Sequence, residues 1–180
     1  MLSRLFRRGA GQEPPAALLY RSVVEQARRP EFYAAFGVPD TVDGRFDMIA
    51  LHMFLVLHRL KAADPDLGQA LFDTMFADMD RSLREMGAGD LGVGRRVRAM
   101  AEALSGRIAA YDAGLSADDA ALAGALRRNL YGTVPDRVPD ERALSALCAY
   151  IREAVRLLAA QDQAQLTQGQ VRFPPPVSPA

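Results

Sequence analysis

Residues 71–98 read LFDTMFADMDRSLREMGAGDLGVGRRVR, and this stretch decides the fold class. Before the glycines, apolar residues recur at steps of three and four, which predicts an amphipathic helix. A second helix is expected from Val93 to about Ala113. The stretch therefore predicts two long helices joined by a short glycine loop. No side chain in the stretch is poised for bond-breaking chemistry, so the pattern favours a charged surface that holds a partner.

The first of these helices carries a single apolar face, made of Leu71, Phe72, Met75, Phe76, Met79, Leu83 and Met86. Most of such a face is ordinary core. Methionine, however, is a flexible gap-filler that is common on adaptable binding surfaces. A groove that accepts an apolar segment of a partner, with Met75 and Met79 among its contacts, is therefore the second interpretation.

Charged residues on the polar face of the first helix are spaced for local ion pairs. Asp80 lies four residues before Arg84, and Arg81 lies four residues before Glu85. Each exposed pair stabilises a helix by only a few tenths of a kcal/mol. These pairs therefore do not distinguish a solvated face from a docking surface.

The second helix begins with three arginines, Arg95, Arg96 and Arg98, on the side opposite its apolar stripe. That stripe consists of Val93, Val97, Met100, Leu104, Ile108 and Tyr111. A helix N-terminus carries partial positive charge, so three cations there are unfavourable unless an anion or an acidic surface answers them. The sequence predicts a basic docking site, with a solvated face as the alternative. The upstream acids Asp73, Asp78 and Asp80 are an internal source of the compensating charge.

Residues 87–92, GAGDLG, match the string G-x-G-x-x-G of dinucleotide-binding folds. That fingerprint requires a strand before the loop, whereas a helix precedes it here. We interpret the glycines as a helix connection that permits left-handed backbone angles.

Working outward, further helices are expected over residues 17–29, 45–63, 65–86, 116–130 and 140–160. Ser116 with Asp119 resembles a capping box, and Asp140 is placed to cap the last long helix. Alternating β-branched runs are missing. The sequence thus predicts an all-α protein: one compact bundle of about six helices over residues 17–160, with a flexible basic lead at 1–16. Residues 161–180 are proline-rich and are expected to be extended or disordered.

Composition excludes several classes of function. The 22 basic and 22 acidic residues cancel, so no global charge favours nucleic acid. The single cysteine, Cys148, excludes an internal disulfide and cysteine-pair zinc motifs, and it lies on an apolar helical stripe. His52 and His58 lie about 120° apart around one helix and cannot readily share a metal. We therefore predict no catalytic residue, no metal site and no cofactor, with both histidines satisfied in the core or an interface.

Two segments bear on membranes. The apolar run at residues 46–60 contains charges and falls short of the about 20 residues that a span needs, so a buried helix is expected. The N-terminus, MLSRLFRR, lacks the features of a secretory signal. It is either a frayed terminus or a short basic piece that contacts an anionic membrane peripherally.

The order of these pieces resembles the ubiquinol-cytochrome c chaperone family, assembly factors of the cytochrome bc1 complex. The resemblance covers about residues 19–131 and rests on LYRSVVEQARRPEFYAAFGVPDTVDGRFDMIALHMFLVLHRLK, on LFDTMFADMDRSLREMGAGDLGVGRRVRAM and on LRRNLYG. By matching positions, the family motif falls on Asp80, Leu83, Arg84, Glu85, Gly87, Gly89, Asp90 and Arg96.

The resemblance implies an all-helical, non-catalytic chaperone whose client is newly made cytochrome b or another bc1 subunit. A bacterial member would work in the cytoplasm, at the cytoplasmic face of the inner membrane. Together with the charge pattern, it gives these expected partner-binding residues: Met75, Met79, Asp80, Arg84, Gly87, Gly89, Asp90, Arg95, Arg96 and Arg98.

Two other classes of function stay open. One is a helical adaptor or regulator that binds an acidic soluble partner. The other is an enzyme acting on an anionic small molecule at the three arginines, for which Asp90 is the sole evident general base.

Overall fold

The computed structural model describes residues 13–85, 87, 89–132 and 139–177, with the side chains of Asp90 and Leu91 also outside the description. Every regular element in this part of the chain is helical, which confirms the all-α prediction. Six of the helices have eight residues or more, as expected, and two short helices accompany them. Residues 1–12 of the predicted basic lead lie outside the described residues, and its last two residues, Pro15 and Ala16, already belong to α1.

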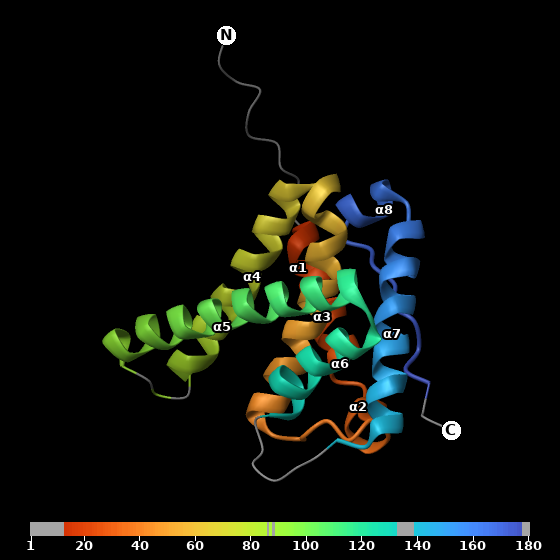
Figure 1. The fold of residues 1–180 in the computed structure, drawn as a ribbon. Helices are drawn as coiled ribbons and strands as arrows, with labels where there is room; N and C mark the ends of the chain where they lie inside the picture. Colours follow the sequence, from red (N-terminus) through yellow and green to blue (C-terminus); the bar gives the residue numbers. More distant parts are fainter. Residues whose placement is uncertain (1–12, 86, 88, 133–138, 178–180) are drawn as a thin grey trace.

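Helix α3 (Val42–Ala63) is the centre of the bundle and contacts α1 (Pro15–Ala27), α4, α5 and α7 (Figure 1). Its apolar run makes this position favourable, because a helix that is apolar around most of its circumference is stable only when surrounded. Thr41 caps it by accepting a hydrogen bond of 3.1 Å from the backbone N–H of Gly44. Gly44 is required here, since a Cβ would lie 2.0 Å from the carbonyl oxygen of Pro39.

Helices α4 (Pro65–Glu85) and α5 (Asp90–Ala117) are the two helices predicted on either side of the glycines, and they form a hairpin whose joined ends project from the body (Figure 1). Proline at the first position of α4 and the carboxylate of Asp64, which accepts from the N–H of Leu67, fix where α4 begins. Gly87 adopts φ +85°, the left-handed angle expected of the connection. Gly89 instead has φ −67° and is the N-cap of α5.

Helix α5 runs further than its sequence suggested, and this shifts the next boundary. It continues through Ala117, so Ser116 lies inside it and does not form the predicted capping box. Asp118 caps α6 (Asp119–Leu126) instead, accepting from the N–H of Ala121 at 2.8 Å. The reason is geometric: the carboxylate immediately preceding α6 reaches the free N–H groups of its first turn. A π-helical turn, Arg127–Tyr131, follows.

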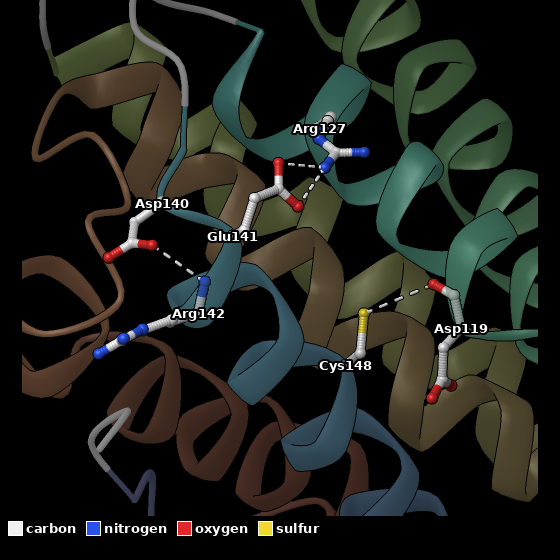
Figure 2. A network of polar contacts seen from close by, with 6 residues as sticks. All are labelled: Asp119, Arg127, Asp140, Glu141, Arg142 and Cys148. Carbon is white, nitrogen blue, oxygen red and sulfur yellow. Dashed lines mark hydrogen bonds and ion pairs between the residues drawn. The ribbon is translucent and has the colours of Figure 1, made fainter.

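Helix α7 (Glu141–Ala160) begins where the sequence predicted. Asp140 caps it, accepting from the N–H of Arg142 at 3.0 Å, and Glu141 pairs with Arg127 of the π-helical turn (Figure 2). Cys148 is buried, and its thiol lies 4.0 Å from the backbone oxygen of Asp119. Burial raises the pKa of this thiol to about 11, so it behaves as the small hydrophobe expected of it.

The described part of the C-terminal segment packs against the bundle and is mostly extended, one of the two states predicted for it (Figure 1). It begins with a short helix, α8 (Gln163–Thr167), and continues as an extended strap through residue 177. Phe173 packs edge-on to His52 with ring centroids 5.3 Å apart, and Gln26 donates to the carbonyl of Pro174 at 3.0 Å. The sequence did not reveal these partners because they lie more than 100 residues away.

His52 is fully buried between α3, α7 and the strap, and both of its ring nitrogens are bonded. Nδ1 donates to the carbonyl of Met48 at 2.8 Å, and Nε2 accepts from the hydroxyl of Tyr150 at 2.8 Å. Burial lowers the pKa of this imidazole to about 4, so it is neutral at physiological pH. The prediction of a satisfied core histidine is confirmed.

Candidate partner-binding surface

The apolar face of α4 divides into a buried part and an accessible part. Met75 is 0% exposed and belongs to the core, which removes it from the predicted partner contacts. Met79 and Leu83, one and two turns closer to the loop, are half-buried and line a surface groove. Helix α4 extends beyond the core that covers its first turns. The same apolar face is therefore buried at the start of the helix and accessible near its end. Met86 lies outside the described residues.

The acidic side chains on the polar face of α4 form ion pairs and hydrogen bonds with nearby residues. Asp80 pairs with Arg84 at 2.6 Å, as the spacing predicted. Arg81 pairs with Asp78 at 2.6 Å and not with Glu85. The hydroxyl of Tyr20 on α1 also donates to Asp78 at 3.0 Å, which fixes that carboxylate within reach of Arg81.

Arg95, Arg96 and Arg98 are exposed on α5, as predicted, and form no ion pair within the described part of the chain. The suggested internal compensation is wrong, because Gln69 donates to Asp73 while Asp78 and Asp80 hold arginines of α4. Within the described residues, therefore, these three arginines at the projecting start of α5 have no ion-pair partner. Gly87 and Gly89 place this helix start, and the side chain of Asp90 lies outside the description.

A groove of about 720 Å³ lies where α4 and α5 meet the first turns of α3. Its apolar lining comes from all three helices: Val42, Phe46, Ile49, Met79, Leu83, Ala99, Met100 and Ala103. Val42 at the rim is 86% exposed. Sequence reasoning identified the α4 wall of this groove but missed the wall supplied by α3.

A buried ion pair between α3 and α5 forms part of the same groove. Arg107 Nη2 lies 2.6 Å from Asp47 Oδ1, and the Asp47 side chain is only 1% exposed. Apart from this ion pair, the two carboxylate oxygens of Asp47 and the Nε of Arg107 are buried and have no hydrogen-bond partner among the described residues. Burial raises the pKa of the Asp47 carboxyl to about 6, against the opposing effect of Arg107.

Two aromatic residues surround this pair. The guanidinium carbon of Arg107 lies 5.7 Å from the ring centroid of Phe46, within the range of a cation–π contact. The hydroxyl of Tyr111, one turn further along α5, is buried and has no hydrogen-bond partner in the described chain. Buried polar groups are nearly always bonded, so this cluster is an exception within the described residues. The signal in the sequence was an aspartate, Asp47, inside an otherwise apolar run.

A second, smaller hollow of about 360 Å³ lies between α3, α4 and α5, with Phe54 in its lining. His58 Nδ1 there donates to Asp112 Oδ1 at 2.9 Å, and Lys61 approaches the other oxygen at 3.4 Å. No serine, threonine or cysteine lines this hollow among the described residues. The histidine is satisfied, as predicted, without a nucleophile to activate.

Comparison with known proteins decides the family. The family model described as Ubiquinol-cytochrome C chaperone matches residues 34–173, well over half of the chain. The chain belongs to the ubiquinol-cytochrome c chaperone family. These are assembly chaperones of the bc1 complex, a role that implies holding proteins and not transforming substrates. The matched span contains the groove and all three exposed arginines.

Curated relatives carry the same description. Ubiquinol-cytochrome-c reductase complex assembly factor 1 of Xenopus laevis is 31% identical over 150 residues, covering 82% of this chain and 74% of the relative. The mitochondrial protein CBP3 of Saccharomyces cerevisiae is 28% identical over 151 residues, covering 81% of this chain and 44% of the relative. The chain also spans 55% of the mouse assembly factor, so it corresponds to about half the length of several relatives.

A solved structure supports the fold over nearly the whole chain. The crystal structure of the Cbp3 homolog from Brucella abortus superimposes with a TM-score of 0.77 at 38% identity, covering 89% of each chain. Within the described residues, moreover, none of the helices combines the length and the hydrophobicity required to cross a bilayer.

Proposed function

We propose that this chaperone holds newly made cytochrome b, a bc1 subunit, without catalysing a reaction, and does so at the cytoplasmic face of a bacterial inner membrane. The observation that carries the proposal is the pairing of an accessible apolar groove with three uncompensated arginines on one projecting hairpin. A membrane protein before insertion offers apolar helices and charged connecting segments, and this surface provides a complement to each.

The groove supplies the apolar contact. Its methionines, Met79 and Met100, adapt to different side chains at low cost, which suits a chaperone that holds a client transiently. Arg95, Arg96 and Arg98 then attract acidic residues of the client or anionic lipid beside it. Asp80, Arg84, Gly87, Gly89 and Asp90 are proposed to shape this end of the hairpin.

An acidic soluble partner is the second candidate. The observation in its favour is that the three arginines alone would suffice to bind it, without use of the groove. If the protein is an adaptor of that kind, partner binding should not depend on Met79 or Leu83.

Deletion of the gene, followed by measurement of assembled bc1 complex, tests the proposal. We expect assembled complex to fall strongly and to return with the wild-type gene. A variant with Arg95, Arg96 and Arg98 changed to alanine should restore little. The control variant, Arg128→Ala with Arg142→Ala, removes exposed arginines elsewhere and should restore assembly. Normal assembly in the deletion strain would contradict the chaperone role.

A further inference from the structure

We propose that the groove between α3, α4 and α5 binds a helix of a protein partner that is apolar except for one neutral polar side chain, which bonds to the Asp47–Arg107 pair. This inference rests on the proposed function in one respect, that the groove is the client-holding surface. It adds the chemistry by which a bound segment is recognised and its register fixed.

The walls of the groove favour a helix over an extended segment. All three surrounding elements are helices, and the described part of the chain offers no strand edge to pair with. An extended peptide would bring unpaired backbone N–H and C=O groups against Phe46, Ile49 and Met100, at a cost for each group. A helix satisfies its backbone internally and packs its side-chain ridges between those of its neighbours.

The floor of the groove favours a polar group. Asp47 lines the groove, its side chain is 1% exposed, and beyond its ion pair with Arg107 neither carboxylate oxygen accepts a hydrogen bond of ordinary geometry from the described residues. The Nε of Arg107 likewise lacks an acceptor among them. These atoms are already buried, so an apolar occupant would leave them unbonded, whereas a polar side chain that reaches them would add hydrogen bonds without further dehydration of the pair.

The charge of the floor selects a neutral group. Asp47 and Arg107 neutralise each other, so a further charge brought into the groove would lose its hydration without gaining a counter-ion. An amide side chain offers an N–H donor for Asp47 and a carbonyl acceptor for Arg107 at once. Asparagine and glutamine fit this requirement best, and serine or threonine fits it in part.

The rim does not reverse this preference. Arg45 at the rim is paired with Asp40 at 2.6 Å, and Asp43 and Arg28 are exposed charges of opposite sign. These exposed groups are hydrated and screened, so they discriminate weakly between bound segments. The buried pair is therefore where specificity resides.

Synthetic helices test the inference. The probes are 18-residue amphipathic peptides with an apolar face of leucine and alanine, in which one central apolar position carries leucine, asparagine, aspartate or lysine. Affinities for the full chain are measured by fluorescence anisotropy. We expect the asparagine peptide to bind about tenfold more tightly than the leucine peptide of similar shape, because a hydrogen bond to a charged group contributes this much. The aspartate and lysine peptides should bind more weakly than both.

A double variant separates recognition from folding. Asp47→Leu with Arg107→Met replaces the buried pair by apolar side chains of comparable size, an exchange that folded proteins often tolerate. This variant should bind the leucine peptide at least as well as the wild type and lose the preference for asparagine. Asp43→Asn, which changes an exposed charge at the rim, should keep that preference. Circular dichroism confirms that each variant is folded.

Three results would overturn the inference: equal preference in the wild type and the double variant, tightest binding of a charged peptide, or no binding of any probe. The inference would also be overturned if the probes competed with self-association of the chain, because a second copy of this chain would then be the occupant of the groove. Failure here is distinguishable from failure of the proposed function. If the deletion strain loses assembled bc1 complex but the peptides show no preference, the chaperone role stands and the groove chemistry fails. If assembly is normal but the peptide preference is found, the groove chemistry stands and the client is another protein.

Discussion

Two buried titratable side chains lie five residues apart on α3, and the protein treats them in opposite ways. His52 packs against Phe32, α7 and the C-terminal strap, and both of its ring nitrogens are bonded, by Met48 of α3 itself and by Tyr150 of α7. Asp47 faces α4 and α5, where Arg107 approaches it but neither oxygen accepts a hydrogen bond from the described chain. One side of α3 is therefore complete in its polar contacts, and the other is not.

We interpret the His52 side of α3 as part of the scaffold and the Asp47 side as part of the partner-binding surface. A bonded polar group in a core specifies one packing arrangement, whereas an unbonded one costs stability unless something completes it. The strap closes the His52 side with Phe173 and Pro174. The Asp47 side opens into the groove of about 720 Å³ that α3 forms with α4 and α5. A partner that fills the groove would complete the second side as the strap completes the first.

The largest expected effect comes from removing Arg107 alone. Arg107→Met leaves the Asp47 carboxylate buried without a counter-ion, and we expect a loss of about 3–5 kcal/mol in the free energy of unfolding at pH 8. Urea denaturation measures it. Adding Asp47→Leu should restore stability to within about 1 kcal/mol of the wild type. A single variant as stable as the wild type would show that the pair is not buried as described.

The pH dependence of stability should differ in sign between the two sides of α3. The pKa of Asp47 is raised from 3.8 to about 6 in the fold, so the folded state holds a proton that the unfolded state releases. Its effect therefore stabilises the protein increasingly as pH falls from about 6 to about 4. The pKa of His52 is lowered from 6.5 to about 4, so there the unfolded state gains the proton and stability falls as pH falls from about 6.5 to about 4. Each effect amounts to about 3 kcal/mol.

Variants isolate these opposite slopes. Relative to the wild type, the Asp47→Leu, Arg107→Met double variant should lose about 3 kcal/mol more on acidification from pH 6.5 to 4, since the contribution of Asp47 is gone. His52→Gln should lose correspondingly less. Surface carboxyls with lowered pKa values, such as those of Asp40 and Glu153, are the same in all three proteins and cancel in the comparison. Parallel stability profiles for the three proteins would contradict the assignment.

Two tyrosines give a matched test of smaller size. Tyr150→Phe removes a hydroxyl that donates to His52 and accepts from Gln26 at 3.0 Å, and should cost about 1–3 kcal/mol. Tyr111→Phe removes a buried hydroxyl with no partner in the described chain, and should leave stability unchanged or slightly higher. Thermal unfolding of both variants measures the difference. Equal losses would show that the Tyr111 hydroxyl is bonded after all.

The smallest effect on stability is expected at the arginines. Changing Arg95, Arg96 and Arg98 to alanine should alter the free energy of unfolding by no more than about 0.5 kcal/mol per residue, because they are exposed and unpaired within the described chain. A larger loss, measured by urea denaturation, would mean that these residues support the hairpin and do not await a partner.

Local signals in the sequence predicted most of the fold. Pro65, Asp140 and the glycine at 87 mark helix ends through interactions within a few residues, and the structure confirms all three. The end of α5 was misplaced because Ser116 and Asp118 are both good caps and the choice between them depends on packing. The strap was underestimated because Phe173 finds its site on His52, far away in sequence.

The candidate site was predicted in part. Met79 and the three arginines follow from helical periodicity alone. The Asp47–Arg107 pair joins residues 60 positions apart, and no local pattern shows which arginine a buried aspartate will meet. Met75 illustrates the same limit. The methionines on the apolar face of α4 are recognisable in the sequence, but the sequence does not show which of them α1 and α3 bury.

Photo-crosslinking in cells tests most directly whether the open side of α3 holds the client. A crosslinking residue at Met79 in the groove is compared with one at Arg156, an exposed position on α7. The account predicts products containing cytochrome b from position 79 and none from position 156. Products containing cytochrome b from position 156 alone, or only soluble proteins from position 79, would contradict it.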